Sequence, residues 1–399
     1  MMRRTAGAAK TLAQRTAARR APQPTRRVLC NAPVASANVQ PLPRSVLLST
    51  VRAMSSFASD TPLSLWEIAE QLRAPEAIRG DREQVVQNIQ SVVITAATTD
   101  AREQQALEII QSNVLEPLLG FLADERLADL HIPTFLTLIK LSSESLIVQE
   151  LLRLDGAAIV AKYLSPADPR LQAAACLTLG NLALDPLSET TMATATVIDP
   201  LLQALESPHE AIQRTAVTTL ANIAGSTQGR EYLCQPEQFI PLCALLSAEN
   251  SDSLRSAVAF ALGNVLSGHD VGAQEGLRES GALPELILMV SPAFPDDVCS
   301  SAAWAIHHGV HMNHENQSMV ADAGGLGMLF QQAFSENEAV QTNALLALES
   351  VTIGHEENTQ RCRDNTEAVT ILKYLQRDSA DDLNVSAKRA LQGLLSQLE

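Results

Sequence analysis

Residues 254–290, LRSAVAFALGNVLSGHDVGAQEGLRESGALPELILMV, contain one structural unit that decides the fold. Apolar residues recur at helical spacing up to Val265, a short polar helix follows, and a second apolar helix begins near Pro284. Gly281 can adopt the positive φ that ends a helix, and Pro284 fits a first helical turn because no N–H is required there. The stretch therefore predicts short helices separated by tight turns.

The same unit returns along the chain with a period near 42 residues. When the last helix of each unit is aligned on its penultimate apolar residue, the anchors are Leu138, Leu179, Leu220, Leu262, Ile306, Leu348 and Leu391, at spacings of 41, 41, 42, 44, 42 and 43 residues. A degenerate earlier unit is expected to end near residues 92–94. This period lies in the range of armadillo and HEAT helical repeats.

Residues 85–399 resemble armadillo repeats more specifically. The middle helices VLEPLLGFLA, IDPLLQALES, FIPLCALLSA and ALPELILMVS share a proline, and the third helices end in patterns such as Ala-Leu-x-Asn. The resemblance implies an all-α, right-handed α-solenoid of about seven to eight three-helix repeats whose third helices line a concave groove. Residues 60–84 are expected to form an N-terminal capping helix region, with Trp66, Ile68 and Leu72 on its inner side.

The charges divide the sequence at residue 59. Residues 1–59 contain ten basic side chains and no acidic one, so the rest holds 19 basic and 45 acidic residues, a net charge of −26. An Arg-rich, acid-free N-terminal segment is typical of an organelle transit peptide, and the alternative is a disordered basic arm. We expect a mitochondrial location, with a plastid second, and a cytosolic or nuclear one if translation starts at Met54 or the arm is not a transit peptide.

The side chains expected to face the groove lie two residues after each anchor. They are Lys140, Asn181, Asn222, Asn264, His308, Ser350 and Gly393. In armadillo proteins, asparagines at this position hold an extended peptide by its backbone, because a carboxamide both donates and accepts hydrogen bonds. The resemblance therefore implies a peptide-binding ladder of Asn181, Asn222 and Asn264. The alternative is that each asparagine bonds the adjoining loop and closes its own helix.

Aromatic residues accompany only two of these positions. Importin-α proteins carry a tryptophan four residues before each ladder asparagine, and here Phe260 precedes Asn264 and Trp304 precedes His308. Leu177 and Thr218 depart from that pattern. We predict a non-enzymatic scaffold or adaptor that recognises an extended, basic protein segment. The alternatives are an importin-α-like carrier of nuclear cargo and a cochaperone of a heat-shock ATPase, and the oligomeric state stays open.

Histidines form the densest chemical cluster, in AIHHGVHMNHEN. His307, His311 and His314 are the candidates for a zinc-type site, and the alternatives are a pH-sensitive groove contact or solvated side chains. Because the H-E-x-x-H arrangement is missing, we expect no metal and no other cofactor.

Other classes are disfavoured. The sequence has no Ser/His/Asp set, paired carboxylates or nucleotide fingerprint, so no enzyme is expected. The acidic body and an aromatic content of 3% disfavour nucleic-acid binding. No uncharged apolar run reaches the ~18 residues of a membrane span. The six cysteines include no C-x-x-C pair and are expected to be reduced and buried.

Overall fold

The computed structural model describes residues 63–74, 80–165, 168–378 and 383–398. The chain divides into Met1–Phe57 and Ala58–Glu399, and only the second unit contains described residues. The predicted N-terminal segment 1–59 therefore lies outside them. The described residues form α-helices and 3-10 helices and no strand. The all-α prediction is confirmed.

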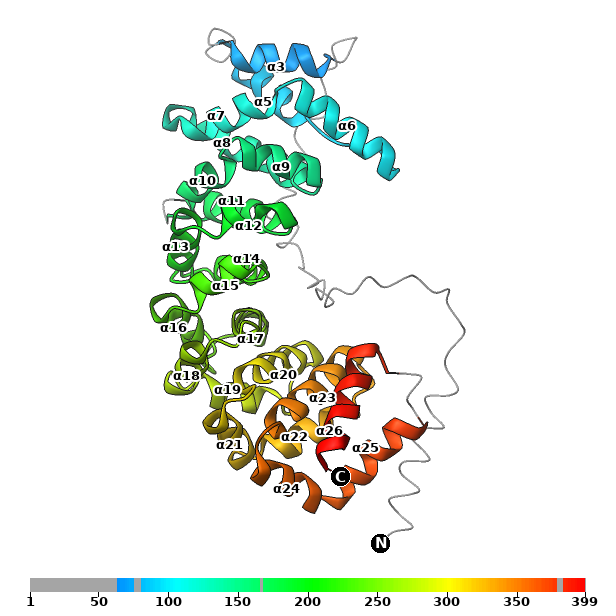
Figure 1. Cartoon of the computed structure of the whole chain (residues 1–399). Helices are drawn as coiled ribbons and strands as arrows, with labels where there is room; N and C mark the ends of the chain where they lie inside the picture. The colour runs from blue at the N-terminus through cyan, green and yellow to red at the C-terminus, as the bar shows by residue number, and fades with distance from the viewer. Residues whose placement is uncertain (1–62, 75–79, 166–167, 379–382, 399) are drawn as a thin grey trace. The chain divides into compact units, whose positions relative to one another are not determined.

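Seven three-helix repeats make up most of this unit (Figure 1). The first helices are α6 (Thr99–Gln111), α9 (Ser145–Arg153), α12 (Glu189–Met192), α15 (Thr227–Leu233), α18 (Val271–Glu279), α21 (His314–Asp322) and α24 (Glu356–Asp364). The second helices are α7 (Leu115–Ala123), α10 (Gly156–Ala161), α13 (Ala195–Ala204), α16 (Pro236–Ala244), α19 (Ala282–Met289), α22 (Gly325–Gln332) and α25 (Thr366–Asp378). The third helices are α8 (Ala128–Leu141), α11 (Pro169–Leu182), α14 (Glu210–Ile223), α17 (Asp252–Leu266), α20 (Asp296–Val310), α23 (Glu338–Thr352) and α26 (Val385–Leu398).

Short 3-10 turns, η1 (Glu125–Leu127), η2 (Lys162–Leu164) and η3 (Pro186–Ser188), complete the connections. Residues 254–290, from which the prediction started, contain the expected three helices: most of α17, which ends one repeat, and α18 and α19, which begin the next. Gly281 has φ 77° and Gly324, one period later, has φ 80°, so both glycines supply the left-handed residue before a second helix. Pro284 lies in the first turn of α19, whereas Pro200 and Pro241 lie one turn deeper in α13 and α16 because those helices begin earlier.

Neighbouring third helices pack side by side along the whole series from α8 to α26. The seven anchors are all buried between them, at 2% exposure or less, and belong to one continuous hydrophobic core. Each buried leucine or isoleucine contributes ~1.5–3 kcal/mol, so a repeat is stabilised mainly by its neighbours. The second helices α7, α10, α13 and α16 lie on the left-hand edge of Figure 1, and α14 and α17 lie to their right.

Two further helices, α3 (Leu65–Arg73) and α5 (Arg82–Ser91), precede the repeats. Ile68 and Leu72 of α3 are buried, as predicted, but Trp66 is 58% exposed, so its predicted inner position is wrong. An α-helix turns by about 100° per residue, which places Trp66 about 200° from Ile68 and on the opposite side of α3. Residues 75–79, where the break near Pro75 was expected, lie outside the described residues.

Buried carboxamides of the first helices connect the later repeats. Gln274 donates through Nε2 to the carbonyls of His308 (3.0 Å) and His311 (3.1 Å). Asn316 donates through Nδ2 to the carbonyls of Gln274 and Gly309, both at 2.8 Å. The same arrangement recurs in the next repeat, where the donors are Gln317 and Asn358 and the acceptors are the carbonyls of Ser350, Ile353, Gln317 and Val351. Buried backbone groups at the helix ends are thereby satisfied.

The described cysteines are free thiols, and Cys176, Cys243, Cys299 and Cys362 are buried, as expected. Burial raises the pKa of Cys176, Cys243 and Cys362 to about 12, so these thiols are protonated at neutral pH. Within the part of the chain that the structure describes, no single helix is long and apolar enough to cross a membrane. The helices α6 and α7, bent by 61°, meet those criteria only as a pair.

Candidate functional site

The predicted ladder asparagines lie in the last turns of three adjacent third helices. Asn181 belongs to α11, Asn222 to α14 and Asn264 to α17, and all three side chains are half-buried. We call these three residues the asparagine row. The surface formed by the accessible sides of the third helices is called the third-helix face. Because α11, α14 and α17 pack in series, the asparagine row runs across this face from one repeat to the next.

Each member of the row donates a hydrogen bond to the preceding third helix. The acceptors are the carbonyls of Ile139 for Asn181 (3.3 Å), Gly180 for Asn222 (3.3 Å) and Ala221 for Asn264 (3.0 Å). The asparagines therefore link neighbouring repeats rather than closing their own helices. Asn181 also donates to Oγ of Ser142, the residue that follows α8, at 2.9 Å, so part of the structural alternative holds for it. A carboxamide has two N–H groups and two acceptor lone pairs, and no described residue engages the second N–H or the Oδ1 of Asn222.

Trp304 fixes the orientation of the third row member. Its Nε1–H donates to Oδ1 of Asn264 at 3.1 Å, and its ring packs against Gly263. A Cβ atom at Gly263 would lie 2.2 Å from Cδ1 of Trp304, so this contact requires glycine. Phe260, half-buried on α17, lies one helical turn before Asn264. The structure therefore brings Trp304 against the asparagine of the preceding repeat, a contact that the spacing within one helix did not predict.

His308 takes the row position on α20 but is more deeply buried than the asparagines. It is 8% exposed, and neither ring nitrogen has a hydrogen-bond partner among the residues described. The ring of Trp304 meets it edge-on with centroids 4.2 Å apart. Burial, together with a smaller effect of the nearby His307, lowers the pKa of His308 to about 2. His308 is therefore neutral in the folded protein.

The three histidines proposed as metal ligands point to different places. His307 places Nδ1 2.7 Å from Oγ of Ser350 on α23, and burial lowers its pKa to about 4. His311 caps α20 with ψ 116°, which breaks the helical relation to His314, and His314 lies beside His355 (5.4 Å between centroids). Across the described ranges, no three His, Cys, Asp or Glu side chains are placed to hold a metal ion.

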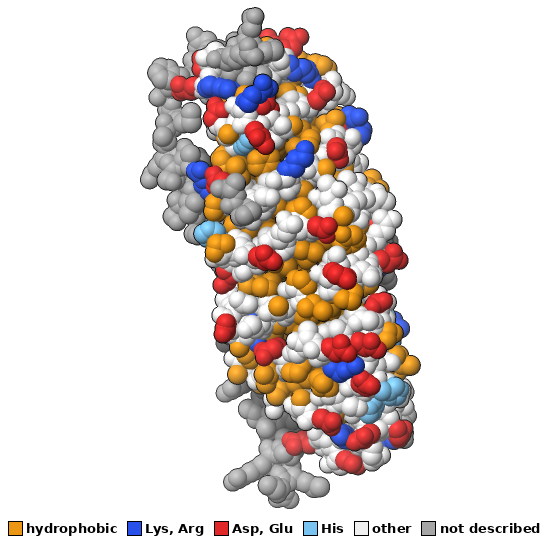
Figure 2. Space-filling view, turned by 90° about the vertical axis from the view of Figure 1, so that its left-hand side faces the viewer, with side chains coloured by type: hydrophobic (Ala, Val, Ile, Leu, Met, Phe, Trp, Pro, Cys, Tyr) orange, Lys and Arg blue, Asp and Glu red, His pale blue; other side chains and the backbone are white. Residues whose placement is uncertain are grey.

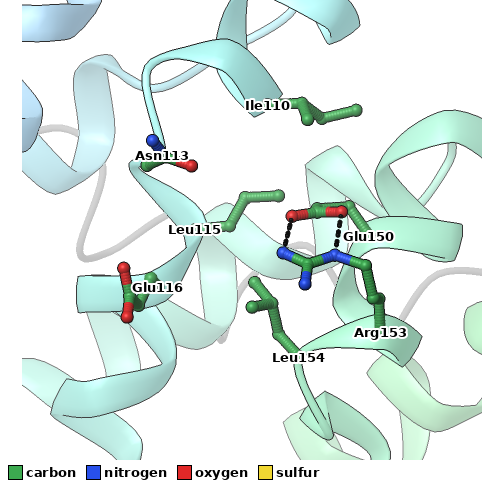
Figure 3. A pocket seen from close by; sticks show the side chains of 7 residues that line it. All are labelled: Ile110, Asn113, Leu115, Glu116, Glu150, Arg153 and Leu154. Carbon is green, nitrogen blue, oxygen red and sulfur yellow. Dashed lines mark hydrogen bonds and ion pairs between the residues drawn. The ribbon is translucent and has the colours of Figure 1, made fainter.

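A small cavity lies away from the third-helix face, between the first two repeats (Figure 3). It has a volume of about 190 Å³ and is lined by Ile110, Asn113, Leu115, Glu116, Glu150, Arg153 and Leu154. Glu150 and Arg153 face each other across two hydrogen bonds of 2.7 and 2.8 Å, so their charges are already paired. A second cavity of about 420 Å³ lies between α10 and α13 and is lined mainly by uncharged side chains.

The face that carries the second helices is largely apolar and acidic. Figure 2 shows orange apolar bands with scattered red acidic side chains over this face. Blue basic side chains gather near its upper end and are few elsewhere. Ile240 on α16 and Leu288 on α19 are 49% and 54% exposed. None of the predicted site residues lies on a second helix.

Comparisons with known proteins agree with this architecture. Residues 157–263 match the HEAT repeat family. Importin subunit alpha-8 of Arabidopsis thaliana is 28% identical over 208 residues, which cover 52% of this chain and 45% of that protein. The chain thus spans about half the length of this curated relative.

Solved structures with the same fold include an engineered protein with TM-score 0.66 and 20% identity, covering 84% of both chains. A designed armadillo repeat protein in complex with the peptide (KR)4 has TM-score 0.54 and 24% identity, covering 61% of this chain and 99% of that one. The chain is an armadillo/HEAT-like repeat protein. The asparagine row of this repeat protein lies on three of its seven third helices.

Proposed function

We propose that this repeat protein is a scaffold or adaptor that holds an extended, basic protein segment along its third-helix face. The observation that carries the proposal is the asparagine row, which repeats one carboxamide per packed helix. Packed helices lie ~8–10 Å apart and an extended chain advances ~3.3 Å per residue. One row member therefore meets the peptide backbone about every third residue.

Charge supports a basic segment. Residues 60–399 carry a net charge of −26, which attracts cationic chains over long range. Glu349 on α23 lies half-buried beside the row position of Ser350, and burial raises the pKa of its carboxyl. Arg389 on α26 already acts against this rise, and a further cationic side chain next to Glu349 would favour the charged carboxylate more. The designed armadillo protein with bound (KR)4 and the importin relative support the same class of ligand.

A double replacement in the row tests the proposal. We expect Asn181→Ala with Asn222→Ala to weaken (KR)4 binding by ~5–150-fold, because two peptide contacts of ~0.5–1.5 kcal/mol each are lost. Titration calorimetry measures the affinity and circular dichroism the melting temperature. The matched control is Asn343→Ala, whose carboxamide also donates to the preceding third helix, at the Ser300 carbonyl (3.1 Å), but outside the row. A lower melting temperature with unchanged affinity would assign the row a structural role only.

An importin-α-like cargo carrier is the second candidate, favoured by the importin relative. Leu177 and Thr218 stand where that family places tryptophans, so the aromatic slots are limited to Phe260 and Trp304. Preference for a nuclear-localisation peptide over (KR)4 at equal charge would support the carrier. Equal affinity for the two peptides would favour a scaffold that recognises positive charge and the peptide backbone.

We also propose that the basic N-terminal segment directs the protein to an organelle, with the mitochondrion first. The ten basic side chains without an acid before Asp60 are the observation behind this proposal. We expect the mature chain to begin between Arg52 and Ser59. N-terminal sequencing of protein isolated from cells measures it, and a chain that still begins at Met1 would contradict cleavage.

A further inference from the structure

Four histidines from two repeats meet beside the asparagine row. His307, His308 and His311 belong to the end of α20, and His269 joins them from the loop between α17 and α18. The ring centroids lie 4.5 Å apart for His269 and His311, 5.4 Å for His269 and His308, and 4.4 Å for His307 and His308. We call these four residues the histidine cluster. Trp304, which orients Asn264, lies in edge contact with His308, so the cluster adjoins the row directly.

The groups packed against the cluster are neutral or basic. Helix α18 contributes Gln274, which bonds the carbonyls of His308 and His311, and α23 contributes the Ser350 hydroxyl and the Leu346 carbonyl to His307. The charges that act on the His308 ring are those of the other three histidines and of Arg230 on α15. In the described part of the chain, no carboxylate forms an ion pair with any of the four rings. None of the groups that shift the pKa values of His269, His307 and His308 is a carboxylate, and Asp270, which follows His269 in the chain, caps α18.

The cluster is also incompletely hydrogen-bonded. Both ring nitrogens of His308 and Nδ1 of His311 are buried without a partner among the described residues. Burying a polar group without a hydrogen-bond partner costs free energy. Placing a second positive charge within ~5 Å of a first costs more, so the four rings cannot all be protonated together without a large penalty. His269 is the exposed member of the cluster, so a proton enters there first, and its charge acts on the groups beside it. Partial burial of the His269 ring, with the nearby His311, lowers the pKa of His269 below its ordinary value.

We propose that the histidine cluster makes ligand binding on the third-helix face acid-sensitive, because protonation of its exposed member His269 sets positive charge beside His308, which contacts Trp304, and expels a basic segment. This inference rests on the proposed function and adds its regulation. Histidine is the side chain whose charge changes between about pH 5 and 8, and the lowered pKa of His269 moves its own change to the acidic part of that range. An acidic segment would respond in the opposite direction.

The test compares three forms of the full chain at constant ionic strength. His269→Asn removes the exposed ring, and His311→Asn removes the ring that lies 4.5 Å from it. Asparagine tolerates the left-handed backbone of His269 (φ 54°). His314→Asn with His355→Asn is the matched control, because these two histidine rings are likewise close, with centroids 5.4 Å apart. Asparagine can also replace His355 as the N-cap of α24. Calorimetry measures the affinity for (KR)4 at about pH 7.5 and about pH 6.

We expect the wild type and the control to lose about two- to threefold in affinity between these two pH values, because a ring with a pKa below about 6.5 is only partly protonated at about pH 6. We expect the cluster variant to lose less than about 1.3-fold. Equal losses in all three forms would overturn the inference. If (KR)4 fails to bind even at about pH 7.5, the proposed function fails, and the cluster is tested without ligand.

The ligand-free measurement uses the fluorescence of Trp304, whose ring lies 4.2 Å from His308. Trp66→Phe removes the other tryptophan, which is 58% exposed. We expect an inflection of the emission between about pH 5.5 and 7 that His269→Asn with His311→Asn abolishes. A titration without that histidine-dependent inflection would contradict acid sensing by the cluster, whatever the ligand.

Discussion

Replacement of Asn316 by leucine is expected to lower the free energy of unfolding by about 2–4 kcal/mol. Asn316 is fully buried, and its Nδ2 donates to two carbonyls, of Gln274 on α18 and of Gly309 on α20. Leucine has a similar volume but leaves both oxygens with one hydrogen bond fewer, where water does not reach them. The contact between the repeats containing α18 and α21 should therefore weaken.

Urea unfolding followed by circular dichroism measures this loss, and hydrogen exchange locates it. In a linear array each repeat is stabilised by its neighbours, so protection should fall first in α18, α20 and α21. The matched control is Asn343→Leu, because Asn343 is half-buried and water can replace its bonds to Ser300. We expect the control to cost less than about 1 kcal/mol. A loss no larger at Asn316 than at Asn343 would contradict this role.

Most of the fold could be predicted from the repeat period, because the positions of buried residues recur with the same period. All seven anchors chosen from apolar spacing are buried between third helices, since a residue every 42 positions meets the same packed neighbours. Trp66 was misplaced because its size suggested burial, whereas the helical angle places it opposite Ile68. Counting 100° per residue along α3 would have avoided the error.

The contacts between repeats were harder to predict. The row asparagines were recognised from their position, but their acceptors, 42 or 43 residues earlier, required the stacked helices. His269 was not included among the predicted site residues, although it precedes His311 by one period of 42 residues. Gln274 and Asn316 are separated by the same interval. Polar residues one period apart are therefore a usable signal for side chains that meet across a repeat boundary.

Mild acid is expected to destabilise the repeat that contains α20. We expect the free energy of unfolding to fall by about 4 kcal/mol between about pH 7 and about pH 5. Burial holds the pKa of His307 at about 4 and that of His308 at about 2, below the ordinary value near 6.5. Above about pH 7 both histidines are neutral whether the chain is folded or unfolded, and they add no pH dependence. As the pH falls below about 6.5, the unfolded chain binds protons that the folded protein excludes. Each of the two buried histidines then lowers the free energy of unfolding by about 2 kcal/mol at about pH 5.

Carboxylates act in a different pH window. The Arg126 guanidinium lowers the pKa of Asp124 to about 2, so any stability that this exposed pair supplies is lost only in stronger acid. A loss between about pH 7 and about pH 5 therefore reports the buried histidines.

The variant that isolates the effect is His308→Asn, which places at this position the residue type of the three asparagine-row members and removes one buried titrating ring. We expect it to reduce the pH-dependent loss from about 4 to about 2 kcal/mol, measured as the difference between urea unfolding free energies at the two pH values. His209→Asn is the control, since His209 is an exposed residue at the start of α14 and its replacement should leave the slope unchanged. If His308→Asn loses as much unfolding free energy between the two pH values as the wild type, other groups bind the protons responsible. Burial of His308 then does not govern the acid response of this repeat.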